Sequence, residues 1–121
     1  MGSRRLIGYS ESLVDGGAAI RFEVQEAGAA APAFAVRYRG RVYAYLNRCA
    51  HMSLELDFVP GRFFDTSGRF LICATHGALY DPIDGRCAGG PCRGRGLQPL
   101  RVAEREGRIE LVDRNIIGHP D

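Results

Sequence analysis

The chain has 121 residues, of which 45% are hydrophobic and 25% are charged, which suits one compact domain and argues against a disordered chain. Its formal net charge of +2 gives no reason to expect a nucleic acid or an anionic membrane as a partner. No apolar run approaches the roughly 20 residues that a membrane helix needs. The arginine pair at residues 4–5 lacks the following apolar stretch of an export signal. We therefore expect a cytoplasmic protein, in which clustered cysteines are metal ligands more often than disulfides.

The first half of the chain favours β-strands. Residues 19–25 alternate apolar and polar side chains, and residues 33–38 and 42–47 flank a turn at Gly40, which predicts a hairpin. The alanine-rich stretch 26–35 contains Gly28 and Pro32, and we predict a loop ahead of the hairpin there.

The second half continues in the same style. Residues 69–74 are β-rich, residues 78–82 resume after a turn at residues 76–77, and residues 84–85 predict a second hairpin. Residues 97–114 predict two strands that turn near Gly107, and no segment keeps a helical period for three turns. We predict an all-β single domain over residues 1–121, with an irregular middle at 49–95 between framework strands.

Two Cys/His pairs stand out in that middle. Cys49 and His51 form a C-x-H pair, and after 21 further residues Cys73 and His76 form a C-x-x-H pair. Thiolate and imidazole are ligands for soft or borderline metals, and two tight loops held side by side would supply four of them. Structural zinc is one interpretation, although zinc fingers pair like ligands with like. A nucleophilic Cys–His dyad is another, but it leaves the second pair unexplained.

The two pairs resemble the signature of Rieske-type [2Fe–2S] proteins. The residues that extend the likeness after the second pair are Gly77, Tyr80, Asp81, Gly85, Gly89, Gly90 and Pro91. The resemblance covers about residues 45–100 and implies a Rieske-type fold of antiparallel β-sheets with a loop-rich cluster-binding subdomain over about residues 45–95. It also implies one [2Fe–2S] cluster per chain, with Cys49 and Cys73 on one iron and His51 and His76 on the other. The interval between the pairs is longer than is usual in the family, which indicates a surface insertion at residues 57–69.

The same resemblance implies the surroundings of the cluster, namely Met52, Leu54, Gly77, Tyr80 and Pro91. Among these, Tyr80 would donate a hydrogen bond to a cluster sulfur, with an ordinary core aromatic as the alternative. High-potential members of the family have a second donor, a serine, where this chain has Ala78, and a loop disulfide where it has Leu54 and Thr75. We therefore expect a reduction potential near or below zero, in the lower half of the roughly −150 to +300 mV range of such centres.

Other residues leave alternatives open. We interpret Cys87 and Cys92 as packed thiols, with a disulfide or cluster ligands as the alternatives. Phe58, Phe63 and Phe64 are interpreted as local core, with a docking patch as the alternative. We interpret Arg86, Arg93 and Arg95 as part of a solvated loop, with the steering of an acidic partner as the alternative.

The resemblance implies a soluble one-electron carrier that passes electrons from a flavoprotein reductase to an oxygenase. It would not itself be an enzyme, because only His119 remains outside the two pairs to build the second iron site of an oxygenase. The alternatives are an accessory subunit or redox sensor, with Cys87 and Cys92 as regulatory thiols, and a structural zinc-binding interaction module.

Overall fold

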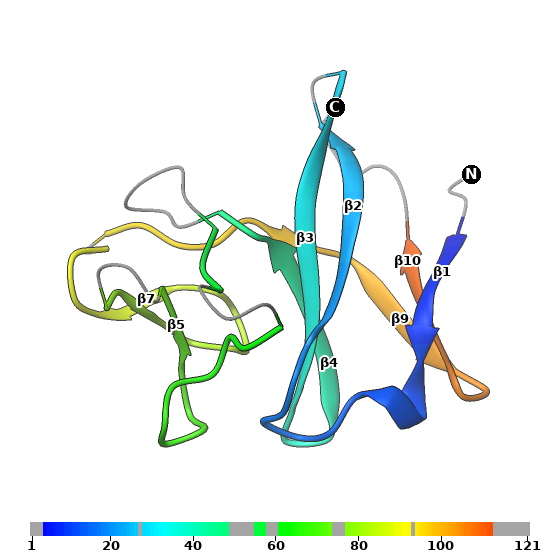
Figure 1. Cartoon of the computed structure of the whole chain (residues 1–121), viewed down its shortest axis with the longest axis horizontal. Helices are drawn as coiled ribbons and strands as arrows, with labels where there is room; N and C mark the ends of the chain where they lie inside the picture. The colour runs from blue at the N-terminus through cyan, green and yellow to red at the C-terminus, as the bar shows by residue number, and fades with distance from the viewer. Residues whose placement is uncertain are drawn as a thin grey trace.

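The computed structural model describes residues 4–26, 28–48, 55–57, 61–73, 77–92 and 94–112. These residues form ten β-strands in three antiparallel sheets (Figure 1). Within the described ranges the single helical element is η1, the 3-10 turn Ser10–Ser12, and no helix there is long and apolar enough to cross a membrane. The all-β prediction is confirmed.

The three sheets follow one another along the molecule, with sheet B between sheets A and C (Figure 1). Sheet A has the order β1 (Arg4–Tyr9), β10 (Arg108–Val112), β9 (Val102–Arg105). Sheet B has the order β2 (Ile20–Glu26), β3 (Ala29–Tyr38), β4 (Arg41–Leu46), β8 (Pro99–Leu100). Sheet C has the order β5 (Leu71–Ile72), β6 (Leu79–Tyr80), β7 (Cys87–Gly89).

Sheet B separates two hydrophobic cores. Successive side chains of a strand point to opposite faces. On β3, Ala33 and Ala35 pack in the core shared with sheet A, whereas Phe34 and Val36 pack in the core shared with sheet C. All four are buried. The small residues thus face sheet A and the larger ones face sheet C.

Tyr45 of β4 attaches sheet C to sheet B. Its side chain is fully buried, and its O–H donates to the carbonyl of Pro82 at 2.7 Å. Burial raises the pKa of Tyr45 above its usual value, so the hydroxyl stays a donor. Pro82 belongs to the turn between β6 and β7, where the N–H of Gly85 donates to the carbonyl of Asp81 at 2.7 Å. The second predicted hairpin is therefore confirmed.

The other two predicted hairpins are also confirmed. β3 and β4 meet at Arg39 and Gly40, and β9 and β10 meet at Glu106 and Gly107. Each turn has positive φ at both residues, at 52° and 83° in the first and 53° and 76° in the second. Two consecutive positive φ angles suit the tight turns of right-twisted hairpins, where glycine carries no steric penalty.

The predicted loop over residues 26–35 is wrong, because β3 begins at Ala29 and pairs with β2 from there onward. Gly28, with φ of 82°, belongs to the turn between those strands. Pro32 is tolerated because it lies just beyond the last paired residues of β3 and β4. There its carbonyl accepts from the N–H of Asn47 at 2.8 Å. The donor that proline lacks is therefore lost only where that ladder ends.

The insertion at residues 57–69 is not a simple surface excursion. Phe63 is fully buried and stacks on Phe34 with a centroid separation of 3.8 Å. Phe64 is half-buried, stacks on Tyr38 at 6.2 Å and forms a β-bridge with Leu71. The core interpretation is confirmed for Phe63 and in part for Phe64, whereas Phe58 lies outside the described residues.

Arg37 of β3 joins sheet B to sheet A. Its guanidinium makes a two-pronged ion pair with Glu104 of β9, at 3.0 and 2.6 Å. It also donates to the carbonyls of Leu13, Ser10 and Gly40 at 2.9, 3.2 and 3.2 Å. Hydrogen bonds from Arg37 and Ser10 hold the pKa of Glu104 below its usual value. The pair is therefore charged at neutral pH.

Candidate metal centre

One of the four predicted ligands, Cys73, is among the described residues. The other three, Cys49, His51 and His76, lie outside them, as do Met52 and Leu54. Within the described ranges no three potential ligands converge. The ligand set itself therefore stays a prediction, and the structure reports on the segments that carry it.

Cys73 begins the connection between β5 and β6, residues 73–78, which we call the second ligand turn because it contains the second predicted Cys/His pair. Its side chain is fully buried. The N–H of Gly77 donates to the carbonyl of Cys73, and the N–H of Cys73 donates to the carbonyl of Ala78, both at 2.8 Å. Gly77 has φ of 74°, which favours glycine. These bonds tie together the two ends of the segment that contains His76.

The prediction that Cys87 and Cys92 are packed thiols is wrong, because the two residues form a disulfide with an S–S distance of 2.09 Å. Their Cα atoms are 5.5 Å apart, within the range that a disulfide spans. β7 carries Cys87 and the chain turns back through Gly90 and Pro91. The sequence favours packed thiols because free cysteines are often simply buried.

The segment Gly89–Cys92, which we call the proline loop, lies against the second ligand turn. A Cβ atom on Gly90 would lie 2.9 Å from the carbonyl oxygen of Gly77 and 3.0 Å from the Cα atom of Ala78. Such contacts leave no room for a side chain, so glycine permits the close approach. The disulfide therefore fastens a loop whose backbone touches the turn that carries Cys73.

Four residues around the turn share one core. Cys73, Ala78, Tyr80 and Cys92 are all fully buried in the cluster between sheets B and C. Tyr80 lies on β6 beside β5 and β7, whereas Pro91 is exposed. The predicted surroundings that the structure describes, Gly77, Tyr80 and Pro91, thus belong to the second ligand turn and the segments next to it.

The donor chemistry of Cys73 fits a metal centre. The disulfide joins the other two described cysteines and does not involve Cys73. It lies at the start of a turn closed by two backbone hydrogen bonds, three residues before a histidine. A sulfur donor close in sequence to an imidazole is suited to a soft or borderline metal.

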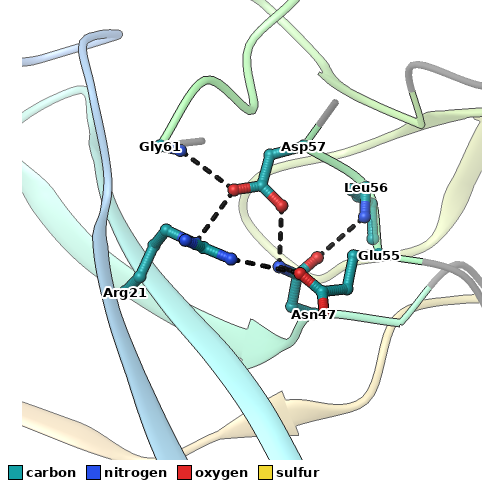
Figure 2. Close-up of polar contacts among 6 residues, drawn as sticks. All are labelled: Arg21, Asn47, Glu55, Leu56, Asp57 and Gly61. Atoms are coloured by element: carbon teal, nitrogen blue, oxygen red, sulfur yellow. Dashed lines mark hydrogen bonds and ion pairs between the residues drawn. The ribbon is translucent and has the colours of Figure 1, made fainter. Parts of the chain in front are cut away.

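The base of the first pair contains a polar network that the sequence analysis did not single out (Figure 2). Asn47 follows β4, two residues before Cys49, and Asp57 lies six residues beyond His51. Both are buried, at 2% and 7% exposure, and Arg21 of β2 pairs with Asp57 at 3.0 Å. An aspartate in an apolar segment next to Leu56 and Phe58 was the available signal, since a buried carboxylate requires partners.

The family comparison matches most of the chain. Residues 6–106 match the family model described as Rieske [2Fe-2S] domain, a range that encloses all four predicted ligands. No curated protein sequence matches the chain at a significant level.

Solved structures with the same fold include two ferredoxins and an oxygenase. The ferredoxin of carbazole 1,9a-dioxygenase from Nocardioides aromaticivorans IC177 is 20% identical with a TM-score of 0.69, covering 93% of this chain and 99% of that chain. The Sphingomonas yanoikuyae B1 ferredoxin is 18% identical with a TM-score of 0.69, covering 93% and 100%. The terminal oxygenase of carbazole 1,9a-dioxygenase from Nocardioides aromaticivorans IC177 is 21% identical with a TM-score of 0.68, covering 98% of this chain and 31% of that chain. At these identities the likeness establishes the shared fold.

Proposed function

Since the chain belongs to the Rieske [2Fe–2S] domain family, we propose that Cys49, His51, Cys73 and His76 hold its [2Fe–2S] cluster. The two cysteines bind one iron and the two histidines bind the other. The observation that carries the proposal is the family match across residues 6–106, which encloses both Cys/His pairs. The buried thiol of Cys73 on its closed turn supports it.

Such a cluster, when bound, accepts and releases one electron. The residues of the chain set how readily it does so. Two thiolates and two neutral imidazoles leave the oxidised site less negative than four thiolates would, which makes reduction easier. Tyr80 would donate to a cluster sulfur, Met52 and Leu54 would restrict the access of water, and Gly77 and Pro91 would lie in the loops around the cluster. With Ala78 in place of a second donor, the potential lies near or below zero, as the sequence predicts.

The role that follows is one-electron transfer between proteins. The chain acts as a cytoplasmic carrier, not as an enzyme, and passes electrons from a flavoprotein reductase to an oxygenase. One solved complex with this fold is described as reduced oxygenase with oxidized ferredoxin in carbazole 1,9a-dioxygenase, with 22% identity and a TM-score of 0.69, covering 90% of this chain and 92% of that chain. In this proposal residues 1–121 are one domain, with a cluster-binding subdomain at about residues 45–95.

The disulfide favours a second candidate role. Disulfides are rare in the reducing cytoplasm and, where present, often respond to redox conditions. A redox sensor or accessory subunit, in which Cys87 and Cys92 alternate between thiols and disulfide, would use that response. Transfer between a reductase and an oxygenase separates the two roles, because a carrier turns over electrons and a sensor does not.

The first test is the cluster itself. Protein purified without oxygen should contain two irons and two acid-labile sulfides per chain, and after reduction it should give the electron paramagnetic resonance spectrum of a mixed nitrogen–sulfur [2Fe–2S] centre. Cys73→Ser should lose the spectrum while Cys92→Ser keeps it. A single zinc ion without sulfide would overturn the proposal in favour of the structural zinc module.

A further inference from the structure

We propose that Asn47, Asp57 and Arg21 form a clamp that closes the base of the first ligand segment and thereby positions Cys49 and His51. The inference rests on the proposed function, because it assigns those two residues to the cluster. It concerns three side chains that the resemblance to the family does not single out, and it gives them a role in holding the cluster.

Asn47 bridges the start and the end of the segment. Its side-chain carbonyl accepts from the N–H of Leu56 at 2.8 Å, and its side-chain amide donates to Asp57 Oδ1 at 2.8 Å (Figure 2). The backbone N–H of Asn47 donates to the carbonyl of Pro32 at 2.8 Å. Both halves of the amide are therefore used across the segment, while its backbone stays fixed to β3.

Asp57 is the centre of the clamp. Its side chain is 0% exposed, and its second oxygen, Oδ2, accepts from the N–H of Gly61 at 2.9 Å and pairs with Arg21 Nε at 3.0 Å. A buried carboxylate is costly unless it is paired and hydrogen-bonded. Few conformations of this segment give both carboxylate oxygens a hydrogen-bonding partner, so the buried carboxylate restricts the segment to one conformation.

Arg21 fixes that arrangement to the framework. It lies on β2, opposite Phe34 in the ladder with β3, so its backbone position is set by sheet B. Its Nη2 also donates to Glu55 Oε1 at 3.1 Å. The guanidinium thus contacts carboxylates on both sides of Leu56, which is fully buried in the core that also contains Cys73. Through these contacts the exit of the segment is fixed relative to the second ligand turn.

The consequence is that the segment between Asn47 and Leu56 leaves and returns to the framework at fixed points. Fixed ends reduce the conformations open to the loop between them, and ligands held by supporting contacts bind a metal in one geometry. A clamp of this kind predicts slow loss of the cluster and a uniform coordination geometry. Neither property follows from fold stability alone.

The test compares Arg21→Gln and Asp57→Asn with the wild type and with Glu104→Gln as the matched control. The control removes the charge from a similarly paired carboxylate that joins sheets A and B, far in sequence from both Cys/His pairs. Three quantities are measured: the rate of cluster loss to an excess of chelator, the linewidths of the paramagnetic resonance spectrum, and hydrogen exchange at the Leu56 amide in the iron-free protein.

Both clamp variants should lose the cluster about tenfold faster, as expected when a buried polar group loses its partner, with broader lines and faster exchange at Leu56. Glu104→Gln should melt at a lower temperature but keep the wild-type rate and linewidths. Wild-type values in Arg21→Gln, or equal acceleration in Glu104→Gln, would overturn the clamp. If Asp57→Asn does not fold, Arg21→Gln decides alone, because that side chain is 44% exposed. A wild-type protein without labile sulfide would instead overturn the proposed function, before any variant is compared.

Discussion

Removing the Cys87–Cys92 disulfide should loosen the proline loop and destabilise the fold by a predictable amount. The change is the double substitution to serine at both positions. The bond joins residues five apart in sequence, and cross-linking so short a segment removes about 2 kcal/mol of conformational freedom from the unfolded chain. Serine at the buried Cys92 lies near the carbonyl of Leu79, which is 3.4 Å from the sulfur it replaces, so the new hydroxyl has an acceptor.

The expected loss corresponds to a fall in melting temperature of about 6–12 °C for a domain of this size. Calorimetry on the iron-free protein measures it without interference from the cluster. In the loaded protein the cluster should also be lost faster to chelator, because the loop touches the turn that carries Cys73. A phosphine reductant should reproduce both effects in the wild type, since Cys87 is only half-buried, and should change nothing in the serine variant. An unchanged melting temperature in that variant would refute the reasoning.

Three further perturbations address other contacts. Glu104→Gln breaks the ion pair with Arg37 and should cost about 1–2 kcal/mol at neutral pH. The pKa of Glu104 is lowered in the folded state. The stabilisation is therefore present above the ordinary pKa of glutamate and disappears as pH falls through the folded-state pKa. Denaturant titrations of the variant and the wild type should converge in acid. Tyr80→Phe should lower the reduction potential by about 40 mV in a redox titration, the equivalent of one hydrogen bond of about 1 kcal/mol; an unchanged potential would contradict the donor role. Gly90→Ala should melt well below Gly94→Ala, because both have positive φ but a Cβ at Gly94 meets nothing within 4 Å; equal melting temperatures would show that the close approach is not needed.

The sequence predicts a strand where apolar and polar side chains alternate, or where a glycine marks the turn that joins it to the next strand. The hairpins at Gly40 and Gly107 follow from alternation on either side of a flexible residue. β1 was not predicted because its side chains are mostly exposed or half-buried, so no clear alternation marks it. The sequence predicts a loop at the start of β3 because Gly28 and Pro32 interrupt the alanine-rich stretch there. Tertiary context decides there, since the stretch pairs with β2 from Ala29 onward and Ala31 is buried in the core shared with sheet A.

The candidate site likewise has residues that the sequence makes visible and residues that it does not. Chemistry-bearing residues are visible in a sequence because few functions need cysteine and histidine at such spacings. Apart from an aspartate in an apolar segment, the proposed supports are not visible, because Asn47, Asp57 and Arg21 become a unit only when β2 and the segment after β4 meet. The disulfide was missed for a different reason: free cysteines are often simply buried, and this outweighed the geometry, although six residues containing two glycines and a proline bend back easily.

The two segments that carry the predicted ligands are anchored by different forces, yet their anchors share one core. Polar contacts hold the first, and a covalent bond closes the loop that touches the second, while Leu56 and Cys92 are buried in the same cluster. Independent sites contribute additively to free energy, whereas residues coupled through a shared core do not. Combining Asp57→Asn with the double serine variant should therefore accelerate cluster loss by less than the product of the separate effects, because loosening either anchor already relaxes the core beneath both. A rate equal to the product would show that the anchors act independently, and that the core between sheets B and C does not couple the two Cys/His pairs.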